Sequence, residues 1–128
     1  MKNKILTFTG DIVAKPRMTQ SDKWKQRSVT SRYWAFKTLL TLQAKLQGFT
    51  LDNQIKIIIS IPMPKSWSKK KRKEMNLKPH QQKPDLSNII KAIEDILLPK
   101  DDSGIYKIIA TKHWINDKKG IIVIQNLN

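Results

Sequence analysis

The segment between Asp85 and Leu98 carries aliphatic side chains at the spacing of an amphipathic helix. Projected at about 100° per residue, these aliphatic side chains fall on one face: Ile89, Ile90, Ile93, Ile96 and Leu97. The polar side chains Asn88, Lys91 and Asp95 fall together on the opposite face. An aliphatic stripe of this kind packs against other elements, so the segment predicts a helix with a buried face and a free polar row.

Prolines set the limits of this helix. Pro84 disfavours helical backbone at Lys83, so the helix is expected to start at Asp85 or Ser87, either of which can cap it. The sequence 99–104 begins with proline and ends with glycine, and it is expected to end the helix and return the chain toward the sheet.

Two further helices are predicted. The stretch Ser31–Gln47 has a possible cap at its start, a glycine just past its end and apolar residues at mostly three- and four-residue steps. The apolar residues that form its expected face are Trp34, Ala35, Leu39, Leu42 and Leu46. A short basic helix, Lys69–Glu74, follows the capping sequence Ser-Trp-Ser at 66–68.

Runs of β-branched residues predict strands at 4–9, 54–61, 105–115 and 120–124. The run 54–61 is short and mostly aliphatic, so it should be buried. The turn 116–120 joins the last two runs, and a C-terminal β-hairpin is the simplest interpretation. The order of elements has no internal repeat and indicates an α/β fold, in which one mixed β-sheet packs against helices in a single domain spanning 1–128.

The charge of the chain is strongly uneven. Its net charge is +15, yet five of its ten acidic residues lie within the eighteen residues 85–102: Asp85, Glu94, Asp95, Asp101 and Asp102. Cationic surface attracts a phosphate backbone, and clustered carboxylates supply oxygen ligands for Mg²⁺ or Mn²⁺. The pattern therefore suggests a metal ion acting on nucleic acid, and the alternative is a chance clustering of acids at a helix start and a turn.

Two basic stretches are candidate DNA-binding segments. The first is a polar arm without periodicity, and the second is the basic helix with the residues before it. The candidate DNA-binding residues are Lys15, Arg17, Lys23, Trp24, Lys25, Arg27, Lys65, Trp67, Lys69, Lys70, Lys71, Arg72 and Lys83. The alternatives are a solvated loop anchored to the core by Trp24 and a basic helix that is simply a solvated surface.

Other classes of protein fit the sequence less well. No stretch approaches the roughly 18 apolar residues of a membrane-spanning helix, and the start of the chain lacks a signal sequence. The chain has no cysteine, and His80 and His113 lie far apart. A cytoplasmic, zinc-free protein that does not contact a membrane is expected.

The polar row suggests a chemistry for the acidic segment. If Asp101 and Asp102 meet Asp85, one or two divalent ions there could activate water for in-line attack on a phosphodiester. Lys91, beside these carboxylates, could orient the phosphate or stabilise its developing charge. The alternative is a solvated helix face on which Lys91 and Asp95 form an ordinary ion pair, worth about 0.3–0.5 kcal/mol.

These residues resemble a known signature. The sequence Lys-Pro-Asp-Leu-Ser-Asn-Ile-Ile-Lys at 83–91, followed by Lys-Asp-Asp-Ser at 100–103, resembles the metal-site pattern of RusA Holliday junction resolvases, especially their phage-associated branch. That pattern is Pro-Asp-x-Asp-Asn-x-x-Lys, a helix, then Asp-Asp. The resemblance extends to 61–72 and 10–17 and so covers most of the chain. It implies a RusA-like fold and an Mg²⁺-dependent homodimeric endonuclease that nicks four-way DNA junctions symmetrically.

The resemblance also implies roles for single residues. Asp85 matches the first metal carboxylate, and Asp102 matches the later catalytic aspartate, with Asp101 beside it as a further metal ligand. Lys91 matches the catalytic lysine, and Asn88 and Asp95 match supporting residues of the same helix.

Position 87 departs from the family pattern, because Ser87 stands where the second aspartate is expected. Losing this carboxylate should weaken metal affinity, although Mg²⁺ can bind through one or two carboxylates and several waters. Two readings of function therefore stay open: a metal-dependent junction nuclease, and a non-catalytic branched-DNA-binding protein of the same fold. A restriction-type Pro-Asp…(Asp/Glu)-x-Lys site is disfavoured, since Glu94 and Asp95 are followed by Ile96 and Leu97 rather than a correctly spaced lysine.

Overall fold

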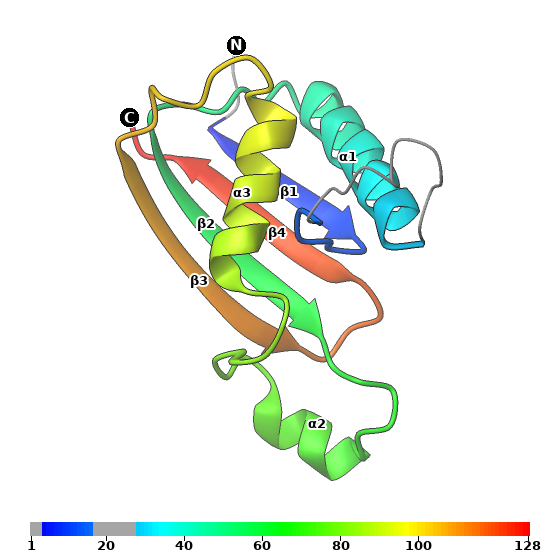
Figure 1. Cartoon of the computed structure of the whole chain (residues 1–128). Coiled ribbons are helices and arrows are strands. Elements are labelled where there is room, and N and C mark those ends of the chain that lie inside the picture. Colours follow the sequence, from blue (N-terminus) through cyan, green and yellow to red (C-terminus); the bar gives the residue numbers. More distant parts are fainter. Residues whose placement is uncertain (1–3, 17–27) are drawn as a thin grey trace.

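Four strands form one mixed β-sheet in the order β1-β4-β2-β3 (Figure 1). The computed structural model describes residues 4–16 and 28–128. The elements are β1 (Ile5–Gly10), α1 (Ser28–Leu46), β2 (Gln54–Pro62), α2 (Lys69–Met75), α3 (Leu86–Leu97), β3 (Lys107–Ile115) and β4 (Gly120–Asn126). The predicted α/β class, with a mixed sheet packed against helices, is confirmed.

The expected C-terminal hairpin is wrong, because β2 lies between the last two strands. β2 pairs in parallel with β3 and antiparallel with β4, so β3 and β4 run in opposite directions without pairing. Three isoleucines of β2, Ile55, Ile57 and Ile59, are fully buried. A strand with such an aliphatic face gains most from a central position, where both of its edges are hydrogen-bonded and its face is covered.

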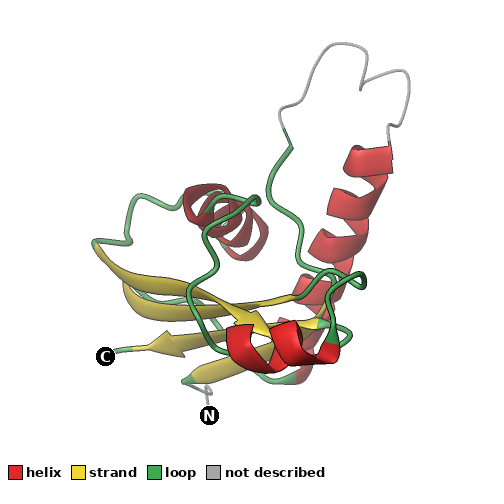
Figure 2. Ribbon diagram, turned by 90° about the horizontal axis from the view of Figure 1, so that it is seen from below, coloured by secondary structure: helices red, strands yellow, loops and turns green. Residues whose placement is uncertain are grey.

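Two helices cover one face of the sheet. Figure 2 shows α1 and α3 on the same side of the four strands. The predicted stripe of α3 is confirmed, since Ile89, Ile93 and Ile96 are buried and Ile90 and Leu97 pack partly buried against the core. In the part of the chain that the structure describes, no helix is long and apolar enough to cross a bilayer.

The predicted face of α1 is wrong. Its buried side chains are Tyr33, Phe36, Leu40 and Ala44, whereas the expected face, Trp34, Ala35, Leu39, Leu42 and Leu46, is largely exposed. Phe36 packs edge-on against Phe8 of β1, with ring centroids 5.3 Å apart. The buried face carries two aromatic side chains, Tyr33 and Phe36, and the exposed face carries one, so the rotation of the helix places the larger number of aromatic rings in the core.

Two glutamine side chains, from the last turns of α1 and from the residue just after it, cover the outer edge of the sheet. The Gln43 amide accepts from Thr9 N at 3.0 Å and donates to Thr9 O at 2.9 Å. The Gln47 amide repeats the arrangement with Thr7, at 3.0 Å and 2.8 Å. The two amides therefore hydrogen-bond the backbone N–H and C=O groups of Thr7 and Thr9, as a neighbouring strand would. They protect an edge that could otherwise pair with another chain.

Removing these amides should destabilise the fold. We expect the Gln43→Ala, Gln47→Ala double variant to lose about 1 kcal/mol of unfolding free energy for each amide, because the edge must then be hydrated. Lys45→Ala, on the exposed side of the same helix, is the control and should change stability by less than about 0.5 kcal/mol. Urea unfolding measures both, and equal stability of the two variants would contradict the edge-capping role.

Candidate active site

Asp85 stands at the start of α3 with its carboxylate free of capping duty. Its backbone carbonyl accepts from the N–H groups of Asn88 and Ile89, both at 3.1 Å, so it holds the N-cap position. The Asp85 side chain makes no capping hydrogen bond to the described residues and is exposed. Of the two predicted starts, the helix therefore uses Asp85, and the carboxylate remains available for a ligand.

A lysine from β3 fixes the loop that carries Asp85. Lys112 Nζ donates to the carbonyl oxygens of Gln82 at 2.7 Å and Pro84 at 2.6 Å. Burial lowers the pKa of Lys112, and the charge of Asp85 acts in the opposite direction. Lys112 was not among the predicted site residues, although a lysine inside an aliphatic strand indicates a specific partner.

Lys91 joins the polar row of α3 to the loop after it. Its Nζ lies 3.2 Å from Asp102 Oδ2 and 3.5 Å from Asp95 Oδ1. The hydrogen bond to Asp102, followed by the charge of Asp95, raises the pKa of Lys91, so the lysine is cationic at neutral pH. Because Lys91 is 54% exposed, these pairs add little stability, and they serve to fix the ammonium group.

Asp95 also pairs with Lys15 from the segment that follows β1. Burial acts to raise the pKa of Asp95, but the hydrogen bond and charge of Lys15 outweigh it, and the pKa is lowered. Backbone contact supports the same arrangement, since Lys15 N donates to Asn88 O at 3.4 Å. The predicted Asn88, Lys91 and Asp95 row thus lies beside a segment far away in sequence.

The other two acids of this region have different surroundings. Burial, followed by the charge of Asp102, raises the pKa of Glu94. Asp101 Oδ1 accepts from Ser103 N at 2.9 Å, and this backbone hydrogen bond lowers the pKa of Asp101. Asp101 therefore shapes the turn, while Asp102 faces Lys91.

The three expected metal ligands do not form one cluster. Asp102 contacts the side chain of Lys91, whose backbone lies six residues and about 9 Å of helix rise beyond Asp85. Among residues 4–16 and 28–128, no three His, Cys, Asp or Glu side chains are grouped as a metal site. The oxygens of Asp85 and Asn88 nevertheless suit Mg²⁺, which needs few protein ligands when waters and phosphates complete its shell. The metal roles of Asp85, Asp101 and Asp102 stay predictions.

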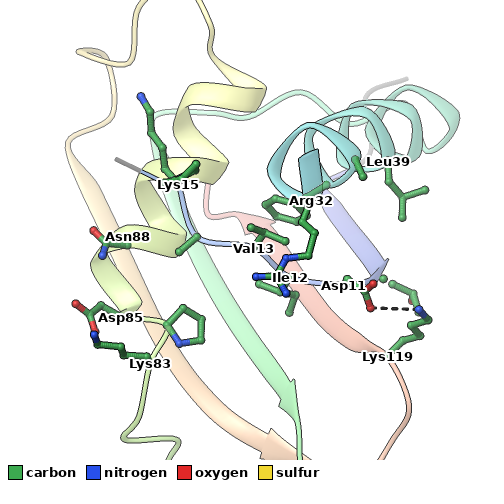
Figure 3. Close-up of a pocket in the computed structure, with 17 residues that line it drawn as sticks. Asp11, Ile12, Val13, Lys15, Arg32, Leu39, Lys83, Asp85, Asn88 and Lys119 are labelled. Atoms are coloured by element: carbon green, nitrogen blue, oxygen red, sulfur yellow. Dashed lines mark hydrogen bonds and ion pairs between the residues drawn. The ribbon is translucent and has the colours of Figure 1, made fainter. Parts of the chain in front are cut away.

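A cavity of about 1040 Å³ opens beside Asp85 (Figure 3). It lies between α1, the start of α3 and the segment that follows β1. The residues that line it are Thr9, Gly10, Asp11, Ile12, Val13, Ala14, Lys15, Pro16, Arg32, Ala35, Phe36, Leu39, Lys83, Pro84, Asp85, Asn88 and Lys119. Four of these are cations, of which Lys15 and Lys83 were predicted to bind DNA, while Arg32 and Lys119 were not. Only the fold reveals that all four side chains line one cavity.

The predicted DNA-binding residues around α2 divide into two groups. The side chains of Lys65, Lys69, Lys70 and Lys71 are exposed. Trp67, one of the predicted DNA-binding residues, packs on Trp114 with centroids 4.7 Å apart, and Lys71 lies 4.2 Å above its ring. Arg72 donates to Trp67 O and Pro64 O. Trp67 and Arg72 therefore hold this segment together.

The first basic stretch lies mostly outside the described residues. This applies to Arg17, Lys23, Trp24, Lys25 and Arg27, whose DNA-binding roles stay predictions.

His80 connects the α2 segment to the sheet. Its ring lies 4.1 Å from Trp114, its backbone N–H donates to Lys112 O at 3.0 Å, and it is 4% exposed. Its Nδ1 atom has no hydrogen-bond partner in the described part of the chain. Burial, followed by the charge of Lys112, lowers the pKa of His80, so the folded protein holds a neutral imidazole.

This histidine should make stability depend on pH. Because the folded pKa of His80 lies below the unfolded value of about 6.5, the unfolded chain binds more protons, and stability should decrease as pH falls below about 6.5. We expect the urea midpoint to drop more between pH 8 and pH 5 in the native chain than in His80→Phe, which keeps an aromatic ring against Trp114. Parallel decreases would show that His80 does not contribute.

Comparison with known protein families identifies the chain. The family model described as endodeoxyribonuclease RusA matches residues 9–125, which include α3, the loop after it and every residue lining the cavity. A comparison with individual curated proteins gave no match. A match over nearly the whole chain, with the described site inside it, shows that the chain belongs to the RusA endodeoxyribonuclease family.

Proposed function

We propose that this chain is an Mg²⁺-dependent endonuclease that resolves four-way DNA junctions, acting as a homodimer that makes paired symmetric nicks. The observation that carries the proposal is that Asp95 and Asp102 hold the ammonium group of Lys91 on α3. Asp85 is the N-cap residue of the same helix, and its side chain makes no capping hydrogen bond to the described residues. Membership of an endodeoxyribonuclease family supports the reaction class. The similarity of the 83–91 sequence to the phage-associated branch is part of the same proposal.

Each residue of the site has a role that follows from its surroundings. Mg²⁺ or Mn²⁺ would supply an activated water and neutralise phosphate charge; Asp85 is the proposed first ligand, and the resemblance adds Asp102 and Asp101, which do not form one cluster with it in the described part of the chain. Lys91 is cationic and fixed, so it can stabilise charge that develops on the scissile phosphate. Lys112 positions the loop carrying Asp85, and Lys15 leaves Asp95 ionised to hold Lys91.

A homodimer suits this chemistry, because two equivalent sites can meet two equivalent strands of a junction. The positive charge of the chain supports binding to such a polyanion, since +15 is spread over a surface where Lys65, Lys69, Lys70 and Lys71 are exposed.

A second candidate function is a branched-DNA-binding protein of the same fold that does not cut. Ser87 favours it, because the first turn of α3 then carries a hydroxyl where the family pattern has a carboxylate. Protein that binds junctions but leaves them intact in both Mg²⁺ and Mn²⁺ would support this alternative.

Loss of the Asp85 carboxylate should separate binding from cutting. We expect Asp85→Asn to slow junction cleavage by about 10²- to 10³-fold or more while junction affinity without metal is kept. The control is Asp117→Asn in the β3–β4 turn, where the amide oxygen can still accept from Lys118 N. Nicking of a four-way junction and of linear duplex with the same sequence, with and without Mg²⁺, measures both variants. Unchanged cleavage by Asp85→Asn would contradict the proposed metal site.

Restoring the family acid at position 87 should strengthen the metal site. Ser87→Asp adds a second carboxylate one turn from Lys91, so cleavage at limiting Mg²⁺ should increase, with metal affinity higher by about 10- to 100-fold. The test is a titration of junction cleavage against Mg²⁺ for both proteins. If the two curves coincide, position 87 has no part in metal binding.

The basic surface predicts a strong salt dependence. Junction affinity should fall by about 10³- to 10⁵-fold between about 50 and 200 mM salt, if six to ten phosphates are neutralised. Lys70→Gln, an exposed residue of α2, should reduce the logarithmic slope by about 1. Filter binding or fluorescence anisotropy measures the slope, and a nearly flat dependence would contradict binding through phosphates.

A further inference from the structure

The cavity beside Asp85 has two chemically different parts. Its walls include the aliphatic side chains of Ile12, Val13 and Leu39. Cationic side chains, which belong to Lys15, Arg32, Lys83 and Lys119, line the same space (Figure 3). Aliphatic walls with a few charged groups are typical of pockets for a ligand that is partly flat and apolar and partly anionic.

Two glycines leave the space that the side chains of Ile12 and Leu39 occupy. A Cβ atom at Gly120 would lie 2.6 Å from Ile12 Cδ1, and one at Gly10 would lie 2.8 Å from Leu39 Cδ2. Ile12 and Leu39 therefore pack directly on the backbone at the paired ends of β1 and β4. These side chains are fixed by the packing of the domain, so the fold itself forms this side of the cavity.

The cations around the cavity are not all neutralised. Lys119 pairs with Asp11 at 3.2 Å, and Lys15 pairs with Asp95. Arg32 and Lys83 form no ion pair with any described residue. Within the described part of the chain, two positive charges without an ion-pair partner therefore line a space that also has aliphatic walls. The cavity lies at the upper end of the usual range for ligand sites, about 300–1000 Å³.

We propose that this cavity receives a single unstacked nucleotide of the DNA strand whose phosphate lies at Asp85. The base would lie between Ile12, Val13 and Leu39, while Arg32 and Lys83 bind its flanking phosphates. The inference rests on the proposed function and adds a source of selectivity. Unstacking a paired base costs a few kcal/mol, and it costs least where pairing is already broken, so a branch point enters the cavity more easily than linear duplex.

The test places the fluorescent base 2-aminopurine at successive positions around the branch point of a four-way junction. Binding is followed without divalent metal, so that no cleavage occurs. We expect a several-fold rise in fluorescence at one position, because a base that leaves the stack is no longer quenched by its neighbours. The same label within linear duplex should show a smaller rise.

Matched variants on α1 test whether the base enters the cavity. Ala35→Trp fills the cavity from an exposed helical position and should abolish the fluorescence rise while weakening junction affinity by about tenfold, the loss of one base contact. Thr38→Trp adds the same side chain outside the cavity and should leave the rise unchanged. Arg32→Gln, an exposed substitution that keeps the fold, should reduce the rise and lower the salt slope by about 1.

The outcomes distinguish this inference from the proposed function. Junctions that are bound and nicked without any fluorescence rise overturn the cavity proposal and leave the nuclease intact. An equal effect of Ala35→Trp and Thr38→Trp, or an unchanged rise in Arg32→Gln, also overturns it. A rise that only Ala35→Trp and Arg32→Gln reduce, in a protein that never nicks, supports the cavity and overturns the nuclease.

Discussion

Burial of the aliphatic stripe of α3 against the sheet is the interaction on which the site depends. Ile89, Ala92 and Ile93 are fully buried, and rotating the helix would expose them to water. The opposite side of α3 therefore has a fixed direction, and Lys91 on that side pairs with Asp95 of the same helix and with Asp102 of the loop that follows. A side chain held by its own helix in this way reaches a phosphate at little further entropic cost.

The second constraint is the attachment of α1 to the edge of the sheet. The amides of Gln43 and Gln47 bind the β1 backbone, and Phe36 packs on Phe8 within the core. These contacts hold the first half of α1 over the segment that follows β1, so Arg32 lines the cavity with Ile12 and Asp85. One side of the site is thus formed by α3 and the other by α1, so the cavity lies between two helices that are packed on the sheet.

The sequence predicted what depends on local pattern. The α3 stripe and every element in order followed from residue spacing and the positions of prolines, and the start of α3 was narrowed to Asp85 or Ser87. What it missed depends on contacts between distant segments. The turn before β4 resembles that of a hairpin, and only competition among strands for the centre of the sheet places β2 between β3 and β4. The same applies to the two apolar faces of α1, of which the face with Tyr33 and Phe36 is buried.

Site residues divide along the same line. Lys91 and Asp102 were predicted from a motif, whereas Lys112, Arg32 and Lys119 come from elements whose local sequence carries no sign of Asp85 nearby. Trp67 is a different case, because a local pattern predicts that it binds DNA while its ring packs on Trp114, a residue 47 positions further along the chain. Basic and aromatic residues that occur together in a sequence are consistent with DNA binding and with packing inside the protein, and the sequence alone does not distinguish the two.

The charge around Asp85 gives Ser87 a physical meaning. Lys83 lies beside Asp85 on the cavity wall, and Lys112 is close enough for Asp85 to influence its pKa. A carboxylate at position 87 would offset these cations and favour a metal ion without DNA, whereas a serine leaves the surroundings of Asp85 positive. Under the proposed function, such a site would repel a free divalent cation and attract phosphate, so metal binding would become more favourable once the negatively charged strand is in place. On that proposal, Ser87 would couple metal affinity to DNA binding in addition to removing a ligand.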